Sequence, residues 1–347
     1  MIDVGLIGFG FAGRTFHAPI IDAVEGLRLA AILQRHGSDA EQAHPSAHIV
    51  RTLEELLAID AIRLVVIATP NTTHFDIARQ CLLAGRDVVI DKPFAPTYAE
   101  ASELVELAKQ QQRLISVYQN RRWDGDFRTL RNLLSEDKLG RVVLFESHFD
   151  RFRPHLKENA WRERPEPGSG VLFDLGPHLI DQAMVLFGVP EAISADVRAE
   201  RDGAAIDDAF DIVLYYPGMR ALLRAGVLVS TPTPRFAVQG TLGGYLKYHL
   251  DPQEDALKRG ETPTGESWGH ETPARWGTLL VAQGDSLVPE KLPTLPGDYR
   301  QYYRNVRDAI LGATPLAVTP EQALRVMRAL EMARESSRQR CVLPWRP

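Results

Sequence analysis

The sequence predicts an α/β protein: an N-terminal Rossmann domain with a doubly wound parallel sheet, followed by an α+β domain with a mostly antiparallel open sheet. Three observations predict this fold. Short apolar runs alternate with helical patterns over the first 120 residues, and a glycine-rich turn follows the first run. Later apolar runs are joined by turn signals such as Pro217-Gly218. A length of 347 residues corresponds to two domains at about 150 residues each.

In the first domain, short runs rich in valine, isoleucine and leucine predict strands that are buried on both faces. Helical patterns lie between these runs, and strand–helix–strand alternation predicts parallel pairing with right-handed crossovers. One helix is expected to stop at Gly85, a plausible C-terminal cap. The expected strands are residues 4–7, 27–33, 64–68, 87–90 and 114–117, and the expected helices are 52–57, 71–84 and 97–111.

The second domain is expected to pack helices on one face of a sheet whose other face is exposed. We place the boundary so that residues 1–120 bind the dinucleotide and 121–347 bind substrate and oligomerise, with the final helix able to return to the first domain. The segment 251–296, rich in proline, glycine and charge, is expected to be loop with a short helix. The expected strands are 141–149, 192–199, 210–216, 221–229 and 237–242, and the helices 173–187, 299–311 and 320–339.

Net charge, cysteine count and the distribution of apolar residues argue against several classes of protein. The 40 basic and 45 acidic side chains give a net charge of −5, which argues against a nucleic-acid binder. Cys81 and Cys341 are too few for a disulfide framework or a tetrathiolate zinc site, and no metal-ligand spacing occurs, so we expect reduced thiols and no metal. With no signal peptide and no long apolar run, we expect a cytoplasmic protein without membrane contact.

The glycine-rich turn Gly8-Phe9-Gly10-Phe11-Ala12-Gly13 follows the first expected strand and precedes a helical stretch. In that context the first glycine permits the tight turn, the second lets a pyrophosphate approach, and the third lets helix and strand pack closely. The alternative is a glycine turn that binds nothing. We favour dinucleotide binding, with the phosphates at the helix N-terminus.

The residues after the second expected strand bear on the choice of cofactor. Folds that prefer NAD place an acidic residue there for the ribose 2′-hydroxyl. This chain has Gln34 and Arg35 instead, and a guanidinium can bind a 2′-phosphate through charge-assisted hydrogen bonds. We therefore expect NADP as the preferred cofactor, with NAD as the alternative if Arg35 is only a solvated loop residue.

Polar residues follow two further strands of the first domain, where ligands of parallel sheets bind. Asp91 and Lys92 precede Pro93, and the Lys92 ammonium is suited to stabilise charge developing on a substrate oxygen. The alternative is a surface lysine held by a structural aspartate. Four residues after the preceding strand are expected to line the cofactor: Thr69, Pro70, Asn71 and His74.

In the second domain, Asp174 and His178 are four residues apart and share one face of a helix. Imidazole titrates near neutral pH, so His178 is a candidate general acid–base and Asp174 a candidate to orient it or to bind a hydroxyl. The alternative is a histidine that only packs or caps. Because Pro177 disturbs the first turn, we expect the helix to begin only near residue 177.

Three other residues are candidates for ligand contacts. Asn120 and Arg121 follow the last expected strand and offer polar groups to a polyol. Trp161 precedes a glycine-rich turn, and its indole is suited to pack on a nicotinamide or a sugar ring. For the tryptophan, ordinary core packing is the alternative.

These motifs, in this order, resemble the glucose–fructose oxidoreductase, inositol dehydrogenase and MocA (Gfo/Idh/MocA) family of NAD(P)-dependent oxidoreductases, and the resemblance covers nearly the whole chain. In that family a Glu-Lys-Pro lysine and an Asp-xxx-His pair form the catalytic set, which implies these roles for Lys92, Asp174 and His178. Asp91 departs from the pattern, because the family usually has glutamate there. Residues 8–19, 120–124 and 174–182 are similar to the scyllo-inositol dehydrogenase branch, several members of which use NADP.

The resemblance implies a dehydrogenase that acts on CH–OH groups and reversibly oxidises a hydroxyl of a cyclic polyol or sugar, such as an inositol, to a ketone. The implied partners are a small-molecule substrate and further copies of the chain, in a homodimer or homotetramer formed through the C-terminal sheet. Two alternatives remain: a non-catalytic dinucleotide-binding sensor, and a reductase of another carbonyl or an imine. For the dehydrogenase we expect Lys92 and His178 to face one cleft, with a substrate oxygen bridging them at about 3 Å.

Overall fold

The computed structural model describes residues 1–156, 165–284 and 286–346, and the chain divides into two compact units. A single boundary at residue 120 does not describe this division, because the first unit also takes in two later segments. The first unit consists of Met1–Asn120, Gln253–Trp268 and Asp298–Leu324, and the second of Arg121–Pro252, Gly269–Gly297 and Arg325–Pro347.

The first unit is built on a six-stranded parallel sheet with the strand order β3-β2-β1-β4-β5-β6, the order of a doubly wound dinucleotide-binding fold. It confirms the predicted Rossmann sheet. The five predicted strands are present, and the three-residue β3 is an addition, too short to give a periodic signal. The strands are β1 Ile2–Ile7, β2 Leu27–Leu33, β3 His48–Val50, β4 Ile62–Ile67, β5 Asp87–Ile90 and β6 Ile115–Val117.

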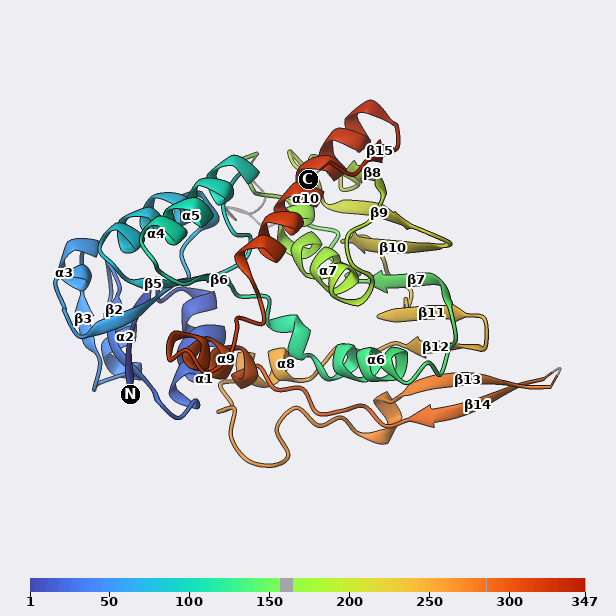
Figure 1. The fold of residues 1–347 in the computed structure, drawn as a ribbon, viewed down its shortest axis with the longest axis horizontal. Helices are drawn as coiled ribbons and strands as arrows, with labels where there is room; N and C mark the ends of the chain where they lie inside the picture. The colour runs from blue at the N-terminus through green and yellow to red at the C-terminus, as the bar shows by residue number, and fades with distance from the viewer. Residues whose placement is uncertain (157–164, 285, 347) are drawn as a thin grey trace. The chain divides into compact units, whose positions relative to one another are not determined.

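Helices lie on both sides of this sheet, with α4 and α5 on one side and α1 and α9 on the other (Figure 1). Two of the helices begin with capping boxes, at Thr52 and Thr97, where the N3 glutamate bonds back to the cap. Including two π- or 3-10-helical turns, the helical elements of this unit are η1 Gly13–His17, α1 Ala18–Asp22, α2 Asp39–Ala43, α3 Leu53–Leu57, η2 Asn71–Thr73, α4 His74–Leu83, α5 Tyr98–Gln110, α8 Gln253–Lys258 and α9 Arg300–Ile310.

The second unit is built on a nine-stranded sheet with the order β14-β13-β12-β11-β7-β10-β9-β8-β15. Within the described part of this second sheet, β7 and β10 are the only strands that pair in parallel, which confirms the mostly antiparallel sheet. The strands are β7 Val142–His148, β8 Ala192–Arg198, β9 Ala209–Tyr216, β10 Met219–Gly226, β11 Phe236–Gly240, β12 Gly243–Lys247, β13 Gly277–Gln283, β14 Ser286–Leu292 and β15 Leu343–Pro344.

Helix α7 packs against β9 and β10 of the second sheet (Figure 1). Helix α10 begins in the first unit and ends in the second, since the division falls after Leu324. The remaining helical elements are η3 Asn120–Trp123, α6 Gly125–Ser135, α7 Val171–Phe187, η5 Pro273–Arg275 and α10 Pro320–Gln339.

Two expectations about the second half were wrong. The segment 251–296 is not merely loop with a short helix, because it also contains the hairpin of β13 and β14. Strand β14 escapes a sequence pattern because it lies at the sheet edge, is exposed along nearly its whole length, and contains Pro289, Glu290 and Lys291. Helix α7 begins at Val171 and not near Pro177; the proline lies inside it and removes only one backbone donor.

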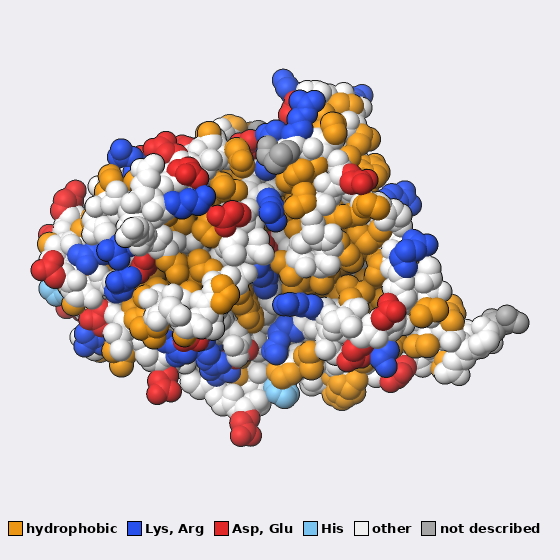
Figure 2. All heavy atoms as spheres, in the orientation of Figure 1, with side chains coloured by type: hydrophobic (Ala, Val, Ile, Leu, Met, Phe, Trp, Pro, Cys, Tyr) orange, Lys and Arg blue, Asp and Glu red, His pale blue; other side chains and the backbone are white. Residues whose placement is uncertain are grey.

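Charge is mixed on the face of the protein shown in Figure 2, where basic and acidic side chains alternate and no stretch of a single sign dominates. Across residues 1–156, 165–284 and 286–346, no helix is long and apolar enough to cross a bilayer.

A buried ion pair lies in the second sheet. The Lys247 ammonium on β12 contacts both carboxylate oxygens of Glu271, at 3.0 and 2.9 Å, and the carbonyl oxygen of Arg275 at 2.8 Å. Both charged side chains are at most 1% exposed. A charge buried to this degree is tolerated only while its partner is present.

We therefore predict that Lys247→Met destabilises the protein by about 3–5 kcal/mol, because it leaves the Glu271 carboxylate buried with its cation removed. Urea denaturation followed by circular dichroism measures the change. The double variant Lys247→Met/Glu271→Leu should recover most of the loss. Lys258→Met, which removes an exposed partner of Glu254, should cost less than about 1 kcal/mol. Equal losses in the two single variants would contradict the prediction.

Candidate functional site

Four backbone hydrogen bonds join the carboxyl ends of five neighbouring strands, β2, β1, β4, β5 and β6. The first residue after each strand donates to the last residue of the next strand in the sheet, at 2.8–3.1 Å. These bonds place the glycine loop, the segment after β4 and the Asp91-Lys92 turn at one edge of the sheet, which is where parallel α/β sheets bind ligands. The donors and acceptors are Gly8 to Leu33, Ala68 to Ile7, Asp91 to Ile67 and Tyr118 to Ile90.

The glycine loop fits a dinucleotide. Gly8 has φ +95°, and a Cβ there would come within 2.8 Å of the Ala68 carbonyl oxygen. A Cβ on Gly13 would overlap the carbonyl oxygen of Gly8, so the turn needs glycine at both positions. A Cβ on Gly10 would meet nothing within 4 Å, which is the open approach that a pyrophosphate needs. Phe9 is buried, Phe11 is exposed, and Ala12 lies between these extremes.

The loop after β2 exposes Arg35 and is held by Arg51, a residue that the sequence analysis missed. Arg51 follows β3, and its Nη1 donates to the carbonyl oxygens of Gln34 at 2.7 Å and Gly37 at 2.9 Å. None of the residues that the structure describes forms a hydrogen bond or ion pair with the Arg35 guanidinium. A basic residue at the end of a strand is a signal, but β3 itself was not predicted.

The segment after β4 is shaped by a buried histidine. The two ring nitrogens of His74 lie 2.9 Å from the carbonyl oxygen of Pro93 and 3.0 Å from that of Thr69. His74 thereby ties the loop after β4 to the turn after β5. Burial lowers the pKa of His74, against the opposing charge of Asp91. In the same segment Asn71 is buried and Pro70 is exposed. The His74 contacts therefore fix the backbone of this segment at the edge of the sheet.

In the turn after β5, the Asp91 carboxylate folds back and contacts the backbone of the next residue, Lys92. Its Oδ1 accepts a hydrogen bond from the Lys92 backbone N–H at 2.9 Å. Burial alone would raise the pKa of Asp91, but His17, Lys92 and His74 together outweigh it and lower that pKa. An anion therefore lies next to the lysine. The Lys92 side chain is half-buried.

In the second unit, Asp174 and His178 lie one turn apart on α7 and so share a face of that helix. His178 is 5% exposed. A carboxylate oxygen of Asp174 lies 3.8 Å from the Arg151 guanidinium. A half-buried carboxylate one turn from a buried imidazole is an arrangement that can orient the ring and handle a proton.

The middle of α7 is tied to the segment that begins α6. Arg122 binds Asp181 through two hydrogen bonds of 2.7 and 2.6 Å, and the Gln182 amide donates to the carbonyl oxygen of Arg121 at 2.8 Å. The Arg121 guanidinium lies 4.8 Å above the Phe149 ring and is buried. Arg121 is therefore packed into the second unit, whereas Asn120 ends the first of the three segments that form the first unit.

The start of α7 is capped from far along the chain by Asp207, another residue that the sequence analysis missed. Its Oδ2 accepts from the Leu172 N–H at 2.8 Å, and its backbone oxygen accepts from Val171 N–H at 2.9 Å. Arg334 on α10 lies 3.4 Å from the other carboxylate oxygen and stacks on Phe173. No local sequence signal exists, because the cap is 35 residues from the helix start.

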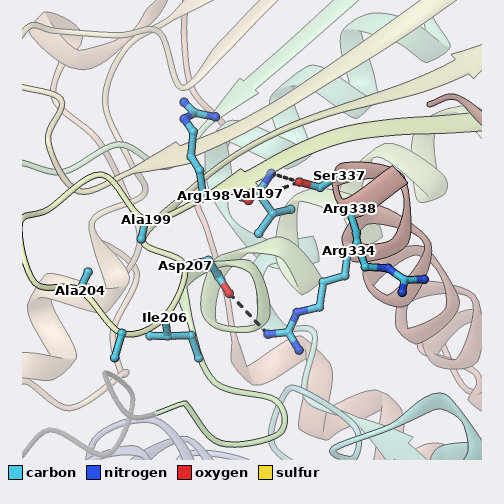
Figure 3. A pocket seen from close by; sticks show the side chains of 10 residues that line it. Val197, Arg198, Ala199, Ala204, Ile206, Asp207, Arg334, Ser337 and Arg338 are labelled. Atoms are coloured by element: carbon cyan, nitrogen blue, oxygen red, sulfur yellow. Dashed lines mark hydrogen bonds and ion pairs between the residues drawn. The ribbon is translucent and has the colours of Figure 1, made fainter. Parts of the chain in front are cut away.

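Figure 3 shows Asp207 and Arg334 pointing toward one another in an open cavity of about 450 Å³. None of the predicted site residues lines this cavity. Arg198, Arg334 and Arg338 are among its lining residues, but Arg198 pairs with Asp196, Glu200 and Asp211. We therefore assign this cavity to the support of α7 and not to the reaction.

The structure thus brings the cofactor candidates and Lys92 to one edge of the first sheet, and Asp174 and His178 to one face of α7 in the second unit. Trp161 lies outside the described residues. Within the described ranges, no group of three or more histidine, cysteine, aspartate or glutamate side chains is arranged to hold a metal ion.

Comparison with known proteins identifies the family. Residues 2–119 match the oxidoreductase family with an NAD-binding Rossmann fold, and residues 131–344 match the C-terminal α/β domain of the same family. The chain belongs to the Gfo/Idh/MocA oxidoreductase family. This confirms the resemblance inferred from the motifs, and it confirms a nicotinamide dinucleotide as the class of cofactor.

Family members of known sequence and structure match over the full length. The chain is 45% identical to the uncharacterized oxidoreductase YdgJ of Escherichia coli, over 99% of this chain and 98% of that one. It is 36% identical to scyllo-inositol 2-dehydrogenase (NADP(+)) IolW of Bacillus subtilis, over 98% and 94%. The structure of the putative oxidoreductase yvaA from Bacillus subtilis superposes with a TM-score of 0.97 at 36% identity, over 99% and 98%.

The cap of α7 yields a stability prediction. Asp207→Ala should lower the free energy of unfolding by about 1–2 kcal/mol, since it removes the side-chain acceptor of the first helical turn. Asp207→Asn keeps an acceptor oxygen and should lose less. Asp202→Ala removes an exposed carboxylate from the same loop and should stay within about 0.5 kcal/mol of wild type. Chemical denaturation gives the three values, and the assignment of the cap fails if Asp207→Ala matches Asp202→Ala.

Proposed function

We propose that this protein is an NAD(P)-dependent dehydrogenase that reversibly oxidises one hydroxyl of an inositol-like cyclic polyol or sugar to a ketone. The observation that carries the proposal is the position of the Asp91-Lys92 turn. Backbone hydrogen bonds between the strand ends hold this turn at the same edge of the sheet as the glycine loop, and parallel α/β sheets bind ligands at that edge. The full-length similarity to a scyllo-inositol 2-dehydrogenase supports the substrate class.

In this proposal the bound dinucleotide supplies the hydride acceptor, and the chain supplies orientation and proton transfer. Oxidation of CH–OH removes a hydride from carbon and a proton from oxygen. His178 acts as the general base for that proton, and as general acid in the reverse direction. The Lys92 ammonium hydrogen-bonds the same oxygen, stabilises its developing negative charge and helps to relay its proton. Asp174 positions the substrate or the His178 ring.

Because Lys92 and His178 belong to different units, their action on one oxygen is part of the proposal. A crystal structure with cofactor and a polyol tests it directly. Both side chains should lie within hydrogen-bonding distance, about 3 Å, of one substrate oxygen. A substrate oxygen that reaches neither side chain would refute the assignment.

We also propose NADP as the preferred cofactor. The loop after β2 offers the Arg35 guanidinium and contains no acidic side chain between Leu33 and Asp39. A phosphate monoester is bound well by arginine, whereas a carboxylate there would repel it. The relative IolW is named as NADP-dependent, in agreement with this reading.

The catalytic roles predict that Lys92→Met and His178→Ala each lower kcat by about 10²–10⁴-fold, since general acid–base groups have effects of that size. Turnover is measured by NADPH absorbance over a panel of inositols, aldoses and ketoses with NADP or NAD. NADPH fluorescence should show that both variants still bind cofactor. Lys109→Met, in an exposed pair with Glu106, is the matched control and should keep wild-type turnover.

Near-wild-type kcat for both catalytic variants on the true substrate would refute the mechanism. If the wild-type protein binds NADPH but oxidises no member of the panel and reduces no ketose, the polyol assignment is wrong. Reduction of another carbonyl or an imine would then identify a reductase instead.

The cofactor preference predicts that Arg35→Asp weakens NADP binding about tenfold or more, while NAD binding changes little, because only NADP loses a phosphate contact. Fluorescence titration measures both dissociation constants. Arg79→Asp makes the same change of charge on α4, where Arg79 pairs with Glu103, and should leave the ratio of the two constants unaltered. An equal response of NADP and NAD to Arg35→Asp would show that Arg35 does not meet the 2′-phosphate.

A further inference from the structure

His17 is a buried histidine that the proposed reaction does not use. It is the last residue of η1, the π-helical turn after the glycine loop, and it has no exposed surface. π-Helical turns are rare and recur at functional sites. Its Nε2 forms no hydrogen bond to any residue that the structure describes. Leaving a buried polar atom in this condition is unfavourable, so a polar attraction must compensate.

The other side of the imidazole is fixed by Tyr303 on α9, which lies 286 residues further along the chain. The Nδ1 atom of His17 is 2.6 Å from the Tyr303 hydroxyl. Burial raises the pKa of Tyr303 well above its ordinary value, so this hydroxyl keeps its proton. The ring of Tyr118 packs on the imidazole with a centroid distance of 4.4 Å, so the ring is held in one orientation.

The free side of the imidazole faces Asp91. The Nε2 atom of His17 lies 3.8 Å from Oδ1 of Asp91, longer than a hydrogen bond but within range of charge attraction. That same oxygen accepts the backbone N–H of Lys92. A proton on Nε2 would face this anion and leave Nδ1 to accept a hydrogen bond from the Tyr303 hydroxyl, so that tautomer satisfies both neighbours.

Other titratable groups near Asp91 do not replace His17. The carboxylate is influenced from η1 by His17, from α4 by His74 and from its own turn by Lys92, while Tyr303 approaches from α9. His74 directs both ring nitrogens at backbone carbonyl oxygens. His17 is therefore the histidine that directs a ring nitrogen at the carboxylate.

We propose that His17, fixed by Tyr303, holds the Asp91 carboxylate in place against the backbone of Lys92, which makes His17 and Tyr303 positioning residues for that lysine. The importance of the lysine rests on the proposed function, whereas the coupling of His17 to Asp91 does not. The shorter aspartate, where the family usually has glutamate, is thus explained by a partner behind it. The carboxylate reaches inward to a buried imidazole.

The coupling is tested without any substrate by following the Asp91 carboxyl carbon in a pH titration, using protein labelled with carbon-13 at aspartate. Asp91→Asn identifies the resonance. Replacing His17 by phenylalanine should raise the pKa of Asp91 by about one unit or more, because an imidazole that favours the anion is lost while burial remains. Tyr303→Phe should raise it by less, since the imidazole remains but is no longer held.

Tyr302→Phe is the matched control, because Tyr302 lies next to Tyr303 on α9 and also has a buried hydroxyl. That hydroxyl donates to Ser116, whereas the hydroxyl of Tyr303 bonds His17. Tyr302→Phe should leave the Asp91 titration at the wild-type value. If His17→Phe does not fold, His17→Gln, which offers an N–H of its own, should show a smaller shift in the same direction. An unchanged Asp91 titration in the folded His17 and Tyr303 variants overturns the proposal, as does an equal shift in Tyr302→Phe.

Activity gives the second readout. His17→Phe should lower kcat about tenfold with little change in KM, and His17→Gln, which keeps an N–H, should restore part of the loss. A purely structural defect would reduce the amount of active enzyme, measured by NADPH binding, and leave the turnover per binding site unchanged. Failure of the wild-type protein to oxidise any polyol would refute the proposed function, while the Asp91 titration would still decide the coupling.

Discussion

The arrangement of the first unit depends on one constraint: neighbouring parallel strands end at the same level. The backbone N–H of the first residue after one strand donates to the carbonyl oxygen of the last residue of its neighbour. These bonds run across the sheet from Gly8–Leu33 to Tyr118–Ile90. These bonds leave little freedom for the loops that follow. The glycine loop, the segment after β4 that His74 holds, and Lys92 with its neighbouring Asp91 carboxylate therefore lie at one edge of the sheet. They are far apart in the sequence.

In the second unit, the main structural feature is the set of contacts that hold helix α7 in place. Helix α7 carries Asp174 and His178, and it is held at its start by Asp207 and in its middle by Asp181 and Gln182. Arg235 continues this network: it is fully buried between the rings of Phe149 and Phe236 and reaches Gln182. Buried charges of this kind add little net stability, but their geometry is demanding, so they fix the register of a helix.

Much of the fold was predictable because buried strands and amphipathic helices leave periodic patterns. The run 87–90 and the helix 320–339 were predicted with the bounds observed. The failures have physical causes. Strand β3 is three residues long, β14 lacks an apolar run because it is exposed, and the start of α7 depends on a cap in a distant loop.

The positions of the candidate site residues were predictable where the sequence signal is local: the glycine loop follows β1, Asp91-Lys92 follows β5, and Asp174 and His178 share a face of α7. They were not predictable where two remote segments meet. Nothing near His17 in the sequence indicates Tyr303, and nothing near Arg51 indicates the loop carbonyl oxygens that it holds. Such pairs exist only once the chain has folded, because topology and not spacing brings them together.

The two ends of the nine-stranded sheet have a consequence for self-assembly. A free sheet edge is a template onto which a strand from another molecule can add. At one edge, β14 contains Pro289, Glu290 and Lys291; at the other, β15 is two residues long and includes Pro344. Proline removes a backbone donor and charge opposes close pairing, so both edges resist edge-to-edge aggregation. Copies of this chain that associate through the sheet thus have its broad face, and not its margins, on which to do so.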